Sequence, residues 1–141
     1  MKDIYGASSP AILIPVAAYD DDNTPAAVDI TGFRSALVVI DVGVGGITFN
    51  GSNKVEFKLT HGDTADGDFT AVTQKDVAGA VVGTGGIIKA LTAAHAAPSV
   101  TKIGYTGGRR FLKLLADFGG THGNATPLAA TVLRFDPYLA P

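Results

Sequence analysis

Residues 54–60 read KVEFKLT and alternate strictly between polar and apolar side chains. In an extended strand successive side chains point to opposite faces, so Val55, Phe57 and Leu59 would share one face. A period of two indicates a half-buried β-strand and does not fit an amphipathic helix. Similar short runs, rich in apolar or β-branched residues, continue along the chain. We expect further strands within residues 34–43, 69–73, 81–91, 100–106, 109–118 and 128–135.

Clusters of glycine, asparagine and aspartate separate these runs. Glycine is favoured where a turn needs positive φ, so GVGG (43–46) and GTGG (83–86) are predicted to be turns or bulges. Neither completes the G-x-G-x-x-G pattern of a nucleotide-binding loop. Only TAAHAAP (92–98) is expected to form a short helix. Short strands with frequent turns predict an all-β, antiparallel β-sandwich, and the length of 141 residues fits one domain.

Both ends of the chain are expected to extend from the sandwich. Three prolines among the first 25 residues disfavour a helix, so residues 1–25 are predicted to form an extended N-terminal arm. The arm carries Ile12, Leu13 and Ile14, which must be buried somewhere. They could lie in the chain's own sandwich as an edge strand, or against a neighbouring protein. The expected sandwich covers residues 26–135, and residues 136–141 form a short C-terminal arm.

Two of the expected strands are apolar on both faces. In 34–43, Leu37 and Val39 stand opposite the main apolar face, and in 109–118 Phe111 and Leu115 do the same. Either an arm or loop of the same chain covers these side chains, or they belong to a protein–protein interface. Charged residues make up only 17% of the chain, which favours some coverage by a partner. The predicted partner-binding residues are Ile12, Leu13, Ile14, Leu37, Val39, Phe111 and Leu115.

The loop THGDTADGDF (60–69) has the composition of a metal site, with one histidine and three aspartates. However, Asp63, Asp66 and Asp68 do not have the spacing of a calcium loop, and no glutamate closes it. His61 is also distant in sequence from the other histidines, and the chain has no cysteine to complete a zinc site. We therefore predict a hairpin loop. No nucleophile motif is present, so the sequence predicts neither an enzyme nor a cofactor.

The net charge of −2 and the scattered basic residues predict no nucleic-acid partner. Lys2 is followed at once by Asp3, and prolines interrupt the apolar stretch 11–18, so no signal peptide is expected. No stretch approaches the ~20 apolar residues of a membrane span. We expect a soluble protein made in the cytoplasm, with no membrane partner.

Two segments resemble a known family. VEFKLTHGDTADGDFTAV (55–72) and KIGYTGGRRFLKLLADF (102–118) are similar to the jelly-roll cement, or decoration, proteins of tailed-phage heads. In that family a strand ending near His and Asp leads to a short Phe-x-x-Val strand, and a Gly-Tyr turn with an Arg-aromatic strand follows later. The positions that match are His61, Asp63, Phe69, Val72, Gly104, Tyr105, Gly107, Arg110 and Phe111.

The resemblance implies a β-sandwich of jelly-roll type that acts as a structural protein of the virion. Such proteins sit as homodimers on the outer surface of the capsid and staple neighbouring major capsid proteins together, without a cofactor. The main alternative is a carbohydrate-binding module on a phage surface, because jelly rolls also occur in lectins. The absence of tryptophan and the presence of only four tyrosines count against that alternative. A small hydrolase is the least favoured class.

Overall fold

The structure is a computed structural model, and it describes residues 3–137. Within these residues, ten strands and one short 3-10 helix follow one another. The strands are β1 (Ser8–Tyr19), β2 (Val28–Asp29), β3 (Phe33–Val42), β4 (Lys54–Gly62), β5 (Thr70–Ala71), β6 (Val77–Ala78), β7 (Ile87–Leu91), β8 (Ser99–Tyr105), β9 (Phe111–Gly119) and β10 (Thr126–Pro137), and the helix η1 is Gln74–Asp76. Within residues 3–137, no helix has the length and apolar character to cross a membrane.

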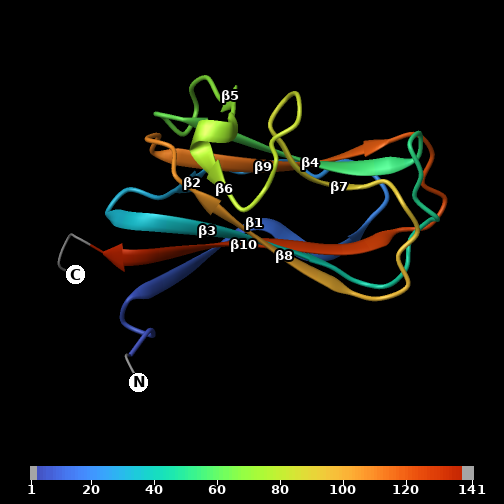
Figure 1. Cartoon of the computed structure of the whole chain (residues 1–141), viewed down its shortest axis with the longest axis horizontal. Coiled ribbons are helices and arrows are strands. Elements are labelled where there is room, and N and C mark those ends of the chain that lie inside the picture. Colours follow the sequence, from blue (N-terminus) through green and yellow to red (C-terminus); the bar gives the residue numbers. More distant parts are fainter. Residues whose placement is uncertain (1–2, 138–141) are drawn as a thin grey trace.

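The strands form two antiparallel sheets that stack in two layers (Figure 1). Sheet A has the order β1-β10-β3-β8-β6, and sheet B has the order β2-β9-β4-β5, with β7 also paired to β4. Most connections pass from one sheet to the other, so strands far apart in sequence become neighbours, as β1 and β10 do. The predicted all-β antiparallel sandwich is confirmed.

The core lies between the two sheets and is built by alternation along each strand. Val38 and Ile40 of β3 face Phe57 and Leu59 of β4 across the layers, and all four side chains are fully buried. Every second residue of these strands points inward because the strand period is two. The strand of residues 54–60 and its inward face are therefore as predicted.

Of the two settings predicted for the N-terminal segment, the edge strand of the chain's own sandwich is the one that the structure shows. Residues 8–19 form β1, an edge strand of sheet A that pairs with β10. Register shifts between Ile12 and Ile14, and again before Ala17, turn Leu13 and Ile14 inward, where they are 2% and 1% exposed. Both prolines of this strand are tolerated because an edge strand needs hydrogen bonds on one side only. At the other end, β10 continues to Pro137, so the predicted C-terminal arm begins within a strand, and residues 138–141 lie outside the described residues.

Of the remaining local predictions, the hairpin and the glycine turns are confirmed and the helix is wrong. The hairpin around THGDTADGDF is confirmed, since β4 pairs with β5 through Thr60–Ala71 and His61–Thr70. The glycines of both glycine-rich stretches include positive-φ turn positions, among them Gly46 and Gly86. The helix predicted for residues 92–98 is wrong. There His95 stacks on Phe49 with ring centroids 5.2 Å apart, and its Nε2 lies 3.0 Å from the carbonyl oxygen of Gly43, so tertiary contacts override local propensity.

Candidate functional site

The outer face of sheet A carries apolar side chains that the strand register places side by side. Residues directly opposite on neighbouring strands share a face, so the register gives rows that run across the sheet. One row is Pro10–Leu133–Leu37–Gly104, the next is Ile12–Thr131–Val39–Lys102, and the third is Ala129–Asp41–Val100. We call these eleven positions the A face.

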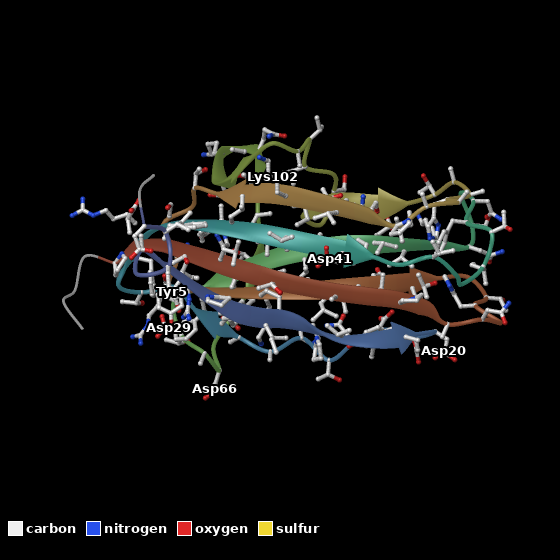
Figure 2. All side chains as sticks on the ribbon, turned by 90° about the horizontal axis from the view of Figure 1, so that it is seen from below. Tyr5, Asp20, Asp29, Asp41, Asp66 and Lys102 are labelled. Carbon is white, nitrogen blue, oxygen red and sulfur yellow. The ribbon has the colours of Figure 1, made fainter. Side chains whose placement is uncertain are left out.

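Most of the A face is accessible. Ile12 and Val100 are 64% and 72% exposed, and Leu37, Val39 and Leu133 are half-buried. Figure 2 views the molecule from this side, with Asp41 over β3 and Lys102 over β8. These two are its charged residues, and neither has an ion-pair partner among residues 3–137. The A face therefore presents apolar side chains to solvent with little charge to solvate them.

The outer face of sheet B is built differently. Lys54 pairs with Glu56 at 3.2 Å along β4, and Lys58 of β4 pairs with Asp117 of β9. The hydrogen bond that Lys58 donates to the Asp117 carboxylate raises the pKa of Lys58 above its usual range. Lys113 lies over the ring of Phe69 at 4.2 Å from its centroid. This face carries its own charges in pairs, as a solvent-facing sheet does.

The structure places the predicted partner-binding residues in three settings. Ile12, Leu37 and Val39 come together on the A face. Leu13 and Ile14 are core residues, so their prediction as contact residues is wrong, because a side chain buried at 1–2% exposure cannot meet a partner. Phe111 and Leu115 belong to β9 in sheet B and do not join the A face. Phe111 is also 9% exposed, so it too was wrongly predicted, and Leu115 is half-buried opposite Lys58.

Sequence reasoning missed the contribution of the last strand to the A face. Ala129, Thr131 and Leu133 of β10 lie between the outward residues of β1 and β3. The signal was present, because LAATVLRF (128–135) is apolar on both alternating faces, as the run 34–43 is. What the sequence could not supply was the register that places these residues beside Ile12 and Leu37.

The loop of residues 60–69 is tied into the fold through its histidine. Nδ1 of His61 lies 2.8 Å from the hydroxyl oxygen of Tyr105, and both residues are buried. Burial lowers the pKa of His61 and raises that of Tyr105. Asp63 pairs with Arg109, so its carboxylate already has a cationic partner. Residues 3–137 contain no cluster of three or more potential metal-ligating side chains.

Comparison with protein-family models, curated proteins and solved structures finds no match to this chain. Its function therefore has to be inferred from its own surfaces. The contrast between the two outer faces is the feature with the clearest functional meaning. The outer face of sheet B carries two ion pairs, whereas the A face presents apolar side chains to solvent.

Proposed function

We propose that this protein is a structural cement protein of a tailed-phage capsid. In this proposal it binds the outer surface of the head as a homodimer and staples neighbouring major capsid proteins without covalent bonds. The single observation that carries the proposal is the A face, an apolar sheet surface whose two charged residues have no partner among the described residues. A protein that binds by burial, with no reaction to perform, needs such a surface.

The proposed role sets the area that the surface must supply. A standard interface removes about 800 Å² from each partner. That is about a tenth of the 7726 Å² of accessible surface of the chain. Repetition over a shell adds avidity, because each copy would touch several subunits at once.

The segments that carry the family resemblance also meet in space. His61 lies near the end of β4 and Asp63 directly follows that strand, whereas Tyr105 ends β8 and Arg109 lies in the loop after it. The two segments join through the His61–Tyr105 hydrogen bond and the Asp63–Arg109 ion pair. We further propose that the sandwich is of jelly-roll type. The alternation of successive strands between the sheets and the pairing of β1 with β10 support this topology.

A matched pair of substitutions tests the proposed surface. Leu37→Glu places a charge on the A face, and Leu115→Glu places the same charge on the outer face of sheet B, where the original leucine is equally half-buried. The measurement is cosedimentation with tailed-phage heads assembled from the major capsid protein alone. We expect Leu37→Glu to abolish binding and Leu115→Glu to retain it, with both variants folded by circular dichroism.

Two results would contradict the proposal. One is binding to heads that is equally strong in the wild type and in Leu37→Glu; the other is a wild-type protein with no affinity for heads and no effect on their resistance to heat. Glycan binding that depends on an exposed aromatic residue would favour the carbohydrate-binding alternative. Tyr105 is 5% exposed and unsuited to that role, and Tyr138 lies outside the described residues.

A further inference from the structure

All four arginines of the chain gather at one end of the sandwich, although they are scattered in the sequence. Arg34, Arg109 and Arg110 line one cleft of about 340 Å³. Arg134 adjoins it, since its guanidinium lies over the ring of Phe33, another residue of the cleft wall, at 4.9 Å. We call this the arginine cleft. In Figure 2 it lies at the end marked by Asp29, opposite the end marked by Asp20.

The strand register explains why the arginines meet. Arg34 lies two residues before the inward-facing Ala36 on β3, and Arg134 lies two residues after the inward-facing Val132 on β10. Arg110 lies two residues before the inward-facing Leu112 at the start of β9. Since side chains alternate along a strand, Arg34 and Arg134 continue the inward rows of sheet A past the end of the core, and Arg110 precedes β9 at the same end. Their charges are therefore directed to the mouth between the sheets.

The charges of the cleft are only partly neutralised. Arg109 pairs with Asp63, and Arg110 pairs with Asp29 at 2.8 Å. Arg134 donates only to neutral oxygens, namely the Ser9 carbonyl and hydroxyl and the Asp29 carbonyl. Arg34 makes no side-chain hydrogen bond or ion pair within residues 3–137. Two of the four guanidinium groups are thus not neutralised by an ion pair within residues 3–137.

Neutral donors line the same cleft. The backbone N–H groups of Gly107 and Gly108 have no hydrogen-bond acceptor in the part of the chain that the structure describes. Gly107 is confined to glycine, because an added Cβ would lie 2.5 Å from the hydroxyl oxygen of Tyr105. The hydroxyl groups of Thr31 and Ser35 add further donors to the lining. Backbone amides and arginine forks together are the donors that bind oxyanions in proteins.

We propose that the arginine cleft binds an oxyanion, either a carboxylate or a phosphate group, with Arg34 as the principal charged contact. Arg34 is the arginine whose planar fork is free for a bidentate contact, and the glycine amides supply donors beside it. This site is separate from the A face, so the inference goes beyond the proposed capsid role. The cleft volume suits a small ligand or a single acidic group of a larger one.

The test is titration of the isolated protein by amide NMR, with succinate in one arm and inorganic phosphate in the other. Ionic strength is held constant with sodium chloride, so that general screening is the same at every point. We expect saturable shifts of the Gly107 and Gly108 amides with a Kd of about 1 mM or tighter for at least one probe. The probe that binds more tightly identifies the class of oxyanion.

Variants decide whether the binding is specific. Arg34→Gln should weaken it roughly tenfold or more, the effect of losing a charged hydrogen-bond partner. The affinity of Arg34→Lys should lie between those of the wild type and Arg34→Gln, because lysine keeps the positive charge but loses the planar guanidinium group that makes two parallel hydrogen bonds. Lys102→Gln removes the same charge from the A face and should leave the affinity unchanged. The inference is overturned if neither probe gives saturable shifts by about 10 mM, or if Arg34→Gln and Lys102→Gln have equal effects. Because no capsid is present, failure here would leave the proposed capsid role standing.

Discussion

The two outer faces of the sandwich are made of the same kind of strands but differ in their chemistry. On sheet B, Lys58 and Asp117 form an ion pair between the neighbouring strands β4 and β9, and Lys54 pairs with Glu56. On sheet A, Asp41 and Lys102 stand without ion-pair partners, within residues 3–137, among apolar side chains. A sheet exposed on one side normally alternates apolar inward and polar outward residues. In sheet B, β4 follows this rule, whereas the A face departs from it across three neighbouring strands, so we interpret the A face as the surface kept for contact.

The largest expected effect separates the inward and outward sides of β1. Leu13→Ala should destabilise the fold by about 2–5 kcal/mol, because it leaves a cavity in the core, whereas Ile12→Ala on the A face should cost well under that. Urea denaturation of both variants measures the difference. Equal, small losses would mean that β1 is a detachable arm, and the A face would then lose its edge strand.

A second substitution breaks a link between the sheets. The hydroxyl of Tyr105 on β8 meets His61 of β4 and accepts the backbone N–H of Arg109 at 3.2 Å. Tyr105→Phe should cost about 1–3 kcal/mol, because both polar groups lose their partner in a buried setting. Tyr19→Phe is the matched control, since its hydroxyl donates to the Pro15 carbonyl at the surface and should matter less. If both variants unfold at the same urea concentration, the Tyr105 contact does not join the sheets energetically.

Much of this fold could be predicted from alternation alone. KVEFKLT and the 34–43 run gave strands and inward faces correctly, because a period of two is a local property of the chain. The N-terminal segment was harder, since a register shift placed both Leu13 and Ile14 in the core, and bulges leave no clear trace in a single sequence. The Ala-rich stretch 92–98 was misjudged because contacts of His95 decide its path.

The candidate surfaces were only partly predictable for the same reason. Leu37 and Val39 were identified from their broken alternation, but their neighbours on β10 and β1 depend on pairings between the first and last strands. The arginine cleft had no local signal at all. Its four arginines come from β3, β10 and the loop between β8 and β9, so only the fold brings them together.

The pH dependence of stability should distinguish the buried His61 from the ion-paired Asp29. Burial lowers the pKa of His61 below its ordinary 6.5. As the pH falls, the unfolded chain therefore takes up a proton on His61 at a higher pH than the folded chain does. The stabilising contribution of neutral His61 is complete above pH 6.5 and is lost as the pH drops through the lowered pKa. Asp29, held at a pKa of about 2 chiefly by its hydrogen bond with Arg110, loses its contribution only below its ordinary value of 3.8. Melting temperatures between about pH 7.5 and pH 5 should fall in the wild type and less in His61→Gln; identical slopes would contradict this assignment.

The smallest effect tests the contrast between the two faces directly. Lys58→Gln removes one partner of a half-exposed ion pair on sheet B, and Lys102→Gln removes an unpaired lysine from the A face. Exposed pairs contribute at most about 1 kcal/mol, so Lys58→Gln should cost a fraction of that, and Lys102→Gln should have no measurable cost. The difference should shrink in high salt, because salt screens the Lys58–Asp117 pair. Equal effects at low salt would mean that Lys102 has an electrostatic partner after all, and the A face would then be less distinct from sheet B than its register indicates.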